Sequence, residues 1–246
     1  MTEAIAVKDL FFTYPDGLDA LCGANMAIQT GETVALIGPN GAGKSTLLYH
    51  LNGLLHSHSG EVRIMGQAVH HKNLKTIRRY IGMVFQNPDD QLFCPTVFDD
   101  VAFGPLNLGM KNDEVSCAVT QALDAVDMKD YEKRSSHHLS LGEKRRVAIA
   151  TVLAMSPSVL ILDEPSANLD PDGKWKLVKL LRSLRQTKLI VTHDFDIVHA
   201  LCTRVIIMDA GRMVASGETR EILDNKALLA THRLAIPEDE LCNLNT

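Results

Sequence analysis

The chain has 246 residues, of which 46% are apolar and 22% are charged. This length and apolar content suit one large folded domain with a sizeable core, and they exclude a largely disordered chain. The formal net charge of -5 and the pI of about 6.0 argue against a nucleic-acid binder, because such proteins usually carry an overall basic charge.

The cysteines and the apolar segments exclude two further classes. The five cysteines are scattered without a C-x-x-C pair, so we expect reduced thiols rather than a disulfide framework or a zinc site. The first ten residues include acidic side chains and no long apolar core, which predicts that they are not a signal peptide. No run reaches the roughly 18 consecutive apolar residues of a membrane span.

The first third of the chain alternates between strand and helix signals. Apolar and polar residues alternate on both sides of a turn at residues 15–17, which predicts antiparallel strands. Residues 33–37 (TVALI) are typical of a strand buried on both faces. A glycine-rich turn follows, then a helical pattern over residues 44–55 and a short strand at residues 81–85.

The rest of the chain predicts a helical part inserted into an α/β core. The pattern is mainly helical from residue 87 to 133, and a second long helix is predicted from Ser140 to about Met155. The remaining expected elements are a helix over residues 171–185 and buried strands at 159–162, 189–192 and 205–208. Such alternation implies a mainly parallel sheet. We therefore expect an α/β core of residues 1–86 and 157–217, a helical subdomain of residues 87–156 and a C-terminal helical tail of residues 218–246.

Residues 38–45 (GPNGAGKS) match the phosphate-binding pattern G-x-x-x-x-G-K-[ST] between a predicted strand and a predicted helix. The glycines let backbone N–H groups point at phosphate oxygens, and the helix dipole adds to the attraction. Lys44 can supply a charge to the phosphates, and the Ser45 hydroxyl can bind Mg²⁺. An ordinary glycine-rich turn is disfavoured, because a chance match is on the order of one per cent. The residues expected to bind the nucleotide here are Gly38, Asn40, Gly41, Gly43, Lys44, Ser45 and Thr46. The fold class that follows is α/β, with a P-loop NTPase core.

Two adjacent carboxylates, Asp163 and Glu164, follow the strand at residues 159–162. Parallel sheets bind ligands at the carboxyl ends of their strands, so both groups can reach a site there. Asp163 suits Mg²⁺ coordination through water, and Glu164 suits a general base that activates the attacking water. Two acids at a strand end are common, but after a P-loop they indicate nucleotide hydrolysis.

Five shorter segments add potential ligands in a fixed order along the chain. They are Tyr14 in FTYPDG, Gln86 after the strand IGMVF, LSLGE at residues 139–143, SANLD at residues 166–170 and His193 in VTHD. Taken singly, most of these residues have an ordinary explanation, because a lone residue of this kind is usually part of the core or of the surface. Together their order and spacing resemble the ABC family of ATPases over nearly the whole chain, with LSLGE in the place of the family signature LSGGQ.

The resemblance implies roles for three residues around the bound nucleotide. Tyr14 would stack on adenine. Gln86 would contact Mg²⁺ or the attacking water. His193 would hydrogen-bond the γ-phosphate and orient the attack.

The resemblance also implies that a second ATPase chain completes the site. Ser140 and Gly142 would bind the γ-phosphate of ATP held by that chain, and Asp170 would bridge the two chains. Two residues depart from the family signature: Leu141 stands where a glycine is usual, and Glu143 where a glutamine is usual. We expect a working site, because the serine and the second glycine are present.

A finer resemblance lies in residues 87–93 (NPDDQLF) and 96–109. These segments are similar to those of the ATPases of energy-coupling-factor transporters, which import cobalt, nickel or vitamins. In that family this stretch receives a helix of the transmembrane subunit. We expect residues 87–104 to form this docking surface, because acids expected to be exposed stand there beside apolar residues, a mixture suited to receiving a helix. The acids are Asp89, Asp90, Asp99 and Asp100, and the apolar residues are Leu92, Phe93 and Phe98.

The resemblance therefore implies an ATPase that uses ATP and Mg²⁺ to power a membrane importer of metal ions or vitamins. Its partners would be a second ATPase chain, identical or related, a transmembrane coupling subunit and a substrate-binding membrane subunit, with no nucleic acid. It would lie peripherally at the cytoplasmic face of the cell membrane.

Several alternatives stay open. The chain could serve another ABC importer, or it could be a soluble ABC ATPase that acts on nucleic acid or ribosomes. The second alternative is disfavoured, because there is one motif set and residues 87–139 are too few for a long coiled-coil arm. A small-molecule kinase would not explain the signature segment. The histidine pairs at residues 56 and 58, 70–71 and 137–138 are expected to be solvated rather than metal ligands.

Overall fold

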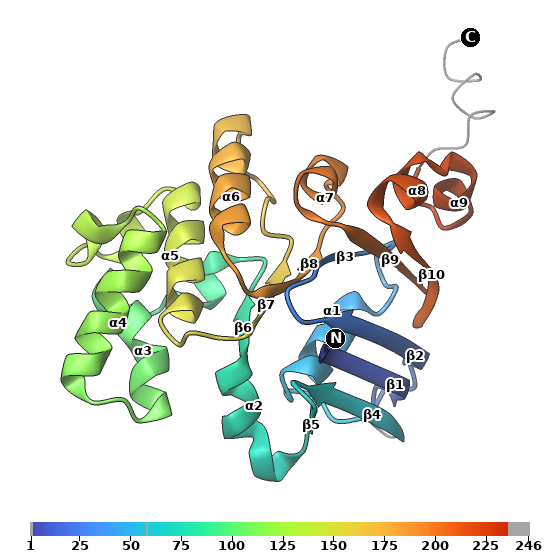
Figure 1. Cartoon of the computed structure of the whole chain (residues 1–246), viewed down its shortest axis with the longest axis horizontal. Coiled ribbons are helices and arrows are strands. Elements are labelled where there is room, and N and C mark those ends of the chain that lie inside the picture. The colour runs from blue at the N-terminus through green and yellow to red at the C-terminus, as the bar shows by residue number, and fades with distance from the viewer. Residues whose placement is uncertain (1, 58, 236–246) are drawn as a thin grey trace. The chain divides into compact units, whose positions relative to one another are not determined.

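The computed structural model describes residues 2–57 and 59–235, and the chain divides into two units. The first unit comprises residues 1–70 and 191–246, and the second comprises residues 71–190. The helices and strands of both units are labelled in Figure 1.

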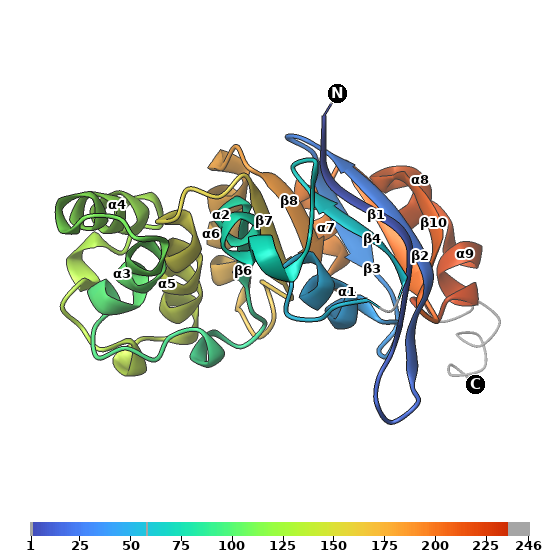
Figure 2. The same ribbon diagram turned by 90° about the horizontal axis from the view of Figure 1, so that it is seen from below.

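A four-stranded antiparallel sheet forms one part of the first unit, and Figure 2 shows its long strands side by side. Its strands, in spatial order, are β2 (Asp19–Gln29), β1 (Glu3–Thr13), β4 (Ser59–Ile64) and β5 (Gln67–Ala68). All of its pairings are antiparallel. Ile5, Leu10 and Ile28 are fully buried, and residues 4–7 are buried in succession, so this part of β1 is covered on both of its faces.

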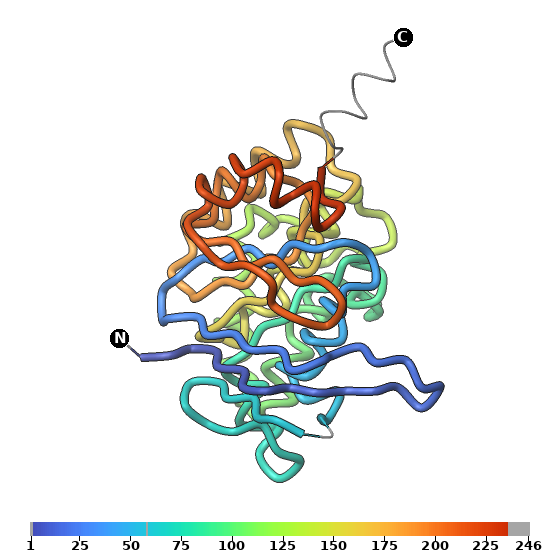
Figure 3. The backbone as a smooth tube through the Cα atoms, turned by 90° about the vertical axis from the view of Figure 1, so that its right-hand side faces the viewer, coloured from blue at the N-terminus to red at the C-terminus, as the bar shows by residue number. Residues whose placement is uncertain are grey.

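A second group of strands in the first unit carries the glycine-rich loop. β3 (Thr33–Ile37) pairs in parallel with β9 (Arg204–Asp209), which pairs antiparallel with β10 (Arg212–Glu218). Residues 34–37 are completely buried, as expected of a parallel strand covered on both faces. The helices of this unit are α1 (Lys44–Leu51), α7 (Phe195–Leu201), α8 (Thr219–Asp224) and α9 (Lys226–Thr231). α8 packs against β9 and β10, and Figure 3 shows this C-terminal part of the unit in red.

An ion pair ties the turn before β3 to the start of β9. Arg204 Nε donates to Glu32 Oε1 at 2.6 Å, and Nη2 donates to Glu32 Oε2 at 3.0 Å and to the Ala27 carbonyl at 2.7 Å. The N–H of Gln29 donates to Glu32 Oε2 at 2.9 Å. Burial alone would raise the pKa of Glu32, but the hydrogen bonds from Arg204 and Gln29 outweigh it and hold that pKa below its ordinary value.

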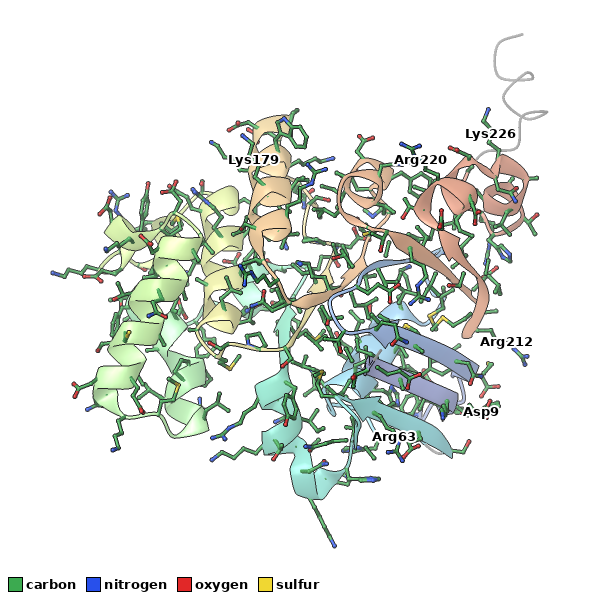
Figure 4. The ribbon with its side chains drawn as sticks, viewed as in Figure 1. Asp9, Arg63, Lys179, Arg212, Arg220 and Lys226 are labelled. Carbon is green, nitrogen blue, oxygen red and sulfur yellow. The ribbon has the colours of Figure 1, made fainter. Side chains whose placement is uncertain are left out.

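We expect Glu32→Gln to lower the free energy of unfolding at pH 7 by about 1 kcal/mol, a modest figure because solvent screens a partly exposed pair. A depressed pKa in the folded state stabilises the fold above the unfolded value of about 4.3, and this stabilisation is lost as the pH falls through the folded value. The difference in the free energy of unfolding between the wild type and Glu32→Gln, measured with urea, should therefore shrink below about pH 4. Glu61→Gln is the matched control, because its partner Arg63 lies exposed on β4 (Figure 4). If the difference in the free energy of unfolding between the wild type and Glu32→Gln stays the same at every pH, the substitution acts through packing and not through the charge of Glu32.

The strands of the second unit bear the predicted carboxylates. β6 (Ile81–Val84) and β7 (Val159–Asp163) pair in parallel, with Val84 opposite Leu162, and β8 (Thr187–Val191) is the other neighbour of β7. α2 (Leu74–Tyr80) precedes β6, and α6 (Pro171–Ser183) follows β7. Asp170 begins α6 as its N-cap by accepting a hydrogen bond from the N–H of Gly173 at 2.7 Å.

Three longer helices make up the rest of the second unit. α3 (Val97–Leu108), α4 (Asn112–Ala125) and α5 (Leu141–Leu153) pack on one another, as Figure 1 shows. Thr96 and Ser140 supply the N-caps of α3 and α5. Short 3₁₀ turns connect the helices and strands: η1 (His71–Asn73), η2 (Pro88–Asp90), η3 (Lys129–Tyr131) and η4 (Ser136–His138).

The expected fold class is confirmed: parallel strand pairs in each unit, an antiparallel N-terminal part, and helices α3 to α5 between β6 and β7 along the chain. The helix after the glycine-rich loop is shorter than expected. It ends at Leu51, because Asn52 caps it and Gly53 turns into the left-handed region with φ of 71°. β4, β5 and α2 lie in a stretch for which no element had been predicted. Within residues 2–57 and 59–235, no helix is long and apolar enough to cross a membrane.

Candidate nucleotide-binding and hydrolysis site

The glycine-rich loop spans residues 38–43 between β3 and α1. A side chain at Gly38 would collide with the carbonyl group of Met208, and one at Gly43 would collide with the carbonyl oxygen of Ala20. Gly43 also has φ of 100°, a conformation that residues with a side chain rarely adopt. The close packing of this loop on neighbouring backbone therefore requires glycine at both positions.

Lys44 begins α1 and folds back over the loop. Its Nζ donates to the carbonyl oxygens of Gly38 at 2.7 Å and Pro39 at 2.9 Å. No side-chain hydrogen bond caps α1 at Gly43 in the described part of the chain. The N–H groups of the first helical turn are the donors that bind phosphate oxygens at such helix starts. Ser45 is exposed at this same turn, as are Asn40 and Gly41 in the loop.

Tyr14 lies beside the start of α1. Its hydroxyl is 3.1 Å from Oγ1 of the buried Thr46, and the two groups share a hydrogen bond. Its ring meets that of Phe12 edge-on, with 5.0 Å between ring centroids. These contacts fix the ring near the loop. Its stacking on adenine stays a prediction.

His193 lies in the first unit, in the turn between β8 and α7. Its ring is exposed. The next residue, Asp194, caps α7, and the N–H of Asp194 donates to Thr192 Oγ1 at 3.1 Å. The turn is therefore held on both sides of the histidine by local hydrogen bonds.

The second unit brings Gln86 and the two carboxylates to one edge of its sheet. Because Val84 is paired in parallel with Leu162, the residues that follow both strands leave the sheet at the same edge. Asp163 and Glu164 are half-buried there, and Gln86 is exposed. Glu164 has φ of 44°, a left-handed conformation that is strained for a residue with a side chain and is concentrated at functional sites.

The start of α5 is closed by a capping box. The N–H and Oγ of Ser140 donate to Glu143 Oε2 at 2.8 and 2.9 Å, and the N–H of Glu143 donates to Ser140 Oγ at 3.4 Å. The bond from the Ser140 N–H holds the pKa of Glu143 below its ordinary value, so this carboxylate is ionised at neutral pH. An anion that approaches this helix start must compete with Glu143 for the same donors.

A cavity of about 330 Å³ lies next to the start of α5. Six of its lining residues are Ser140, Leu141, Gly142, Glu143, Asn168 and Asp170. Leu141 remains 37% exposed, and a side chain at Gly142 would meet only Leu169. The residues expected to act on a second chain therefore share one hollow on the surface of the second unit.

One residue at this location was missed by the sequence analysis, which gave Arg145 no role beyond its place in the helix predicted from Ser140 to about Met155. Arg145 is only 2% exposed and donates to the backbone carbonyls of both the Gln86 and the Ala167 segments. Helical periodicity was the available signal, because residue 145 falls on the same face as the buried Ala148, Ile149 and Val152.

The predicted site residues are thus divided between the two units. Tyr14, the loop residues and His193 belong to the first unit, and Gln86, Ser140, Gly142, Asp163, Glu164 and Asp170 belong to the second. Among the described residues no group of three or more His, Cys, Asp or Glu side chains could hold a metal ion, and His58 lies outside those residues. The roles assigned to the individual residues stay predictions.

These features define a class of protein. A buried parallel strand leads into a loop that requires glycine, a helix then starts with Lys44 and Ser45, and carboxylates end another parallel strand. This arrangement is that of a P-loop nucleotide-binding α/β protein.

Comparison with known proteins places the chain within a family. The sequence profile of the ABC transporter family matches residues 21–167. The chain is 48% identical to the energy-coupling factor transporter ATP-binding protein EcfA of Methanocaldococcus jannaschii over 238 residues, which are 95% of this chain and 85% of that protein. The chain therefore belongs to the ABC transporter family, and it is an ATPase whose hydrolysis of ATP is coupled to transport.

Solved structures agree with this assignment. One is cbiO1 from Clostridium perfringens, described as part of the ABC transporter complex cbiONQ, with a TM-score of 0.83, 40% identity and coverage of 96% of this chain and 97% of that one. Another is the ATP-binding cassette MJ0796 as a dimer in a post-hydrolysis state bound to ADP and Pi, with a TM-score of 0.78, 28% identity and coverage of 88% and 99%.

Proposed function

We propose that this chain is the ATPase subunit of an importer of the energy-coupling-factor type. The cargo would be a metal ion such as cobalt or nickel, or a vitamin, and the subunit would sit at the cytoplasmic face of the cell membrane. Similarity to EcfA and to cbiO1, over nearly the whole chain in both cases, supports this class of transporter. The proposed partners are a transmembrane coupling subunit, a substrate-binding membrane subunit and a second ATPase chain, identical or related.

The observation that carries the proposal is an exposed apolar surface in the second unit, which we call the docking surface: Phe93, Phe103 and Leu106. These side chains are 59%, 49% and 51% exposed. The rings of Phe93 and Phe103 meet edge-on with 5.0 Å between centroids, so they form one continuous patch. Exposed apolar patches of this kind mark interaction sites, and a helix of a membrane subunit is a suitable occupant.

The structure corrects the sequence prediction for one residue of this segment. Asp100 was expected to be exposed, but it is only 3% exposed, and the apolar Leu92 is 2% exposed. Asp100 Oδ1 accepts hydrogen bonds from the N–H groups of Phe93 at 2.9 Å and Cys94 at 2.8 Å. A carboxylate that satisfies two loop amides is buried for a structural reason. It holds the backbone of Phe93 in place at the docking surface.

We expect Phe103→Ser to reduce transport in vesicles containing the complete transporter by at least about tenfold, because an interface loses most of its affinity when a central aromatic anchor is removed. Basal ATPase activity of the isolated subunit should stay within about twofold, since Phe103 lies on α3 and is not one of the predicted catalytic residues Gln86, Glu164 and His193. Val214→Ser on β10 is the matched control, because it removes an apolar side chain that is 41% exposed elsewhere. Unchanged transport by Phe103→Ser would show that this surface does not receive the membrane subunit.

The nucleotide would be bound as MgATP. Ser45, Gln86 and Asp163 offer a hydroxyl, an amide and a carboxylate oxygen, and hard oxygen ligands of this kind fit Mg²⁺. The bound ion would neutralise phosphate charge during hydrolysis. The chain's own groups would do the remaining work: Lys44 and the loop N–H groups hold the phosphates, Glu164 takes a proton from the attacking water, and His193 orients the γ-phosphate.

The same proposal covers the organisation of the chain. An α/β core of residues 1–86 and 157–217 would bind the nucleotide, the helical residues 87–156 would face the membrane subunit, and the tail from residue 218 would follow. The alternative is the ATPase of another ABC importer. Co-purification of the tagged chain with its membrane partners decides between them, because an energy-coupling-factor transporter contains a small substrate-binding membrane protein.

A further inference from the structure

One buried cation connects α5 to two loops that carry predicted catalytic residues. Arg145 lies in the second turn of α5 and is fully covered by protein. Its Nη1 donates to the carbonyl oxygens of Gln86 at 2.6 Å and Phe85 at 3.2 Å, and its Nη2 donates to that of Ala167 at 3.3 Å. Because a guanidinium is planar and rigid, one side chain fixes both loops relative to the helix.

The same guanidinium also interacts with the charges of Asp163 and Glu164. Burial lowers the pKa of Arg145, and the two carboxylates act in the opposite direction. The Nε atom has no hydrogen-bond partner in the described part of the chain. A buried charge with incomplete hydrogen bonding is a poor source of stability, and an apolar side chain of similar volume can often replace it without loss. Stability alone therefore does not account for an arginine here.

We infer that Arg145 is a positioning residue for ATP hydrolysis: it holds the backbone at Gln86 and the backbone that follows the predicted catalytic carboxylates, and it makes these loops move with α5. This inference rests on the proposed function, because it assigns Arg145 to the hydrolysis step of the proposed site. Gln86 carries one of the three carbonyls, and Ala167 follows Glu164 by three residues. A displacement of either loop would move a group that must align the attacking water.

The location of Arg145 on α5 gives the contact a second consequence. Ser140 is the N-cap of the same helix, only five residues before Arg145. A phosphate that displaces Glu143 from Ser140 and shifts α5 would therefore also shift the segments of Gln86 and Ala167. Binding at the signature end of one chain would in this way be transmitted to the catalytic residues of that same chain.

The test compares Arg145→Gln and Arg145→Lys with the wild-type chain. Glutamine offers only two N–H donors, and lysine carries its donors on one nitrogen without the planar fork that reaches both loops, although it keeps the positive charge. We expect kcat for ATP hydrolysis to fall at least about tenfold in both variants, with KM changed by less than about threefold, because misplaced groups reduce turnover more than ground-state binding. Hydrogen exchange should become faster at the amides of residues 85–88 and 167–169, while residues 33–51 keep their wild-type rates.

A matched control separates positioning from a general effect of arginine removal. Arg79 is exposed, lies in the same unit and donates to the Leu108 carbonyl at 2.9 Å, so Arg79→Gln should leave kcat and these exchange rates unchanged. Wild-type kcat in Arg145→Lys, or faster exchange spread evenly over both units, would overturn the inference. If Arg145→Gln does not fold, Arg145→Lys decides alone. Failure of the proposed function looks different: if the importer type is wrong, the wild-type chain still hydrolyses ATP but drives no energy-coupling-factor transport, and if the site is wrong, Glu164→Gln hydrolyses ATP at the wild-type rate.

Discussion

Glu164→Gln should still bind MgATP but hydrolyse it at least ~100-fold more slowly than the wild-type chain, because general-base catalysis contributes at least that factor. Glu164 follows the buried strand β7 and is held half-buried in a left-handed backbone conformation. The amide is nearly the same size as the carboxylate, so it keeps the shape of the site while removing the group that accepts the proton of water. Single-turnover hydrolysis and equilibrium binding of a fluorescent ATP analogue measure the two properties separately.

Two variants serve as controls for this prediction. Glu61→Gln makes the same chemical change at a side chain of β4 that is 39% exposed, and it should hydrolyse ATP at the wild-type rate. Lys44→Ala should lose binding itself, because its ammonium group lies over the loop that holds the phosphates. Hydrolysis by Glu164→Gln within a few-fold of wild type would remove Glu164 from the role of base.

Much of the fold could be predicted from the sequence, because its strands carry strong local signals. Residues 33–37 and 159–162 are short β-rich apolar runs, and each is a strand covered on both faces. Residues 59–80 carried no comparable signal. They are short elements, and the two residues of β5 exist only through pairing with β4, which is a tertiary effect that no local pattern encodes.

The glycine-rich loop could be recognised from the sequence, but the contacts of the candidate site could not. The pattern at residues 38–45 identified the loop, because glycine there is imposed by collisions with Met208 and Ala20. In the segment after β6, the type of a residue does not reveal whether its side chain is exposed. Asp100 is polar yet buried, because its carboxylate accepts hydrogen bonds from two loop amides. Arg145 was missed for the same reason. A charged residue is usually solvated, and the groups that surround the Arg145 guanidinium, backbone carbonyls and the charges of Asp163 and Glu164, come from segments distant in the sequence.

The last prediction concerns assembly, and it combines two substitutions. The Glu164→Gln chain should form a dimer with MgATP and remain trapped in it, because every binding group is present while cleavage is slow. Adding Ser140→Arg should abolish that dimer. Ser140 is exposed at the capped start of α5, beside the cavity of about 330 Å³, and a bulky cation would fill this hollow and remove the hydroxyl donor. Size-exclusion chromatography with light scattering, with and without MgATP, measures the change.

The outcomes distinguish a shared site from a site contained in one chain. Loss of the N-cap costs about 0.5–2 kcal/mol of stability, so the melting temperature of the double variant must be checked before its assembly is interpreted. ATP binding to the monomer should survive, because Tyr14 and the loop lie in the other unit. A dimer of equal stability in both variants would show that Ser140 does not touch the nucleotide of a second chain. If Glu164→Gln alone stays monomeric with MgATP, the shared site requires a related partner ATPase. With that partner, the Glu164→Gln chain must form a dimer, and the chain that also carries Ser140→Arg must not.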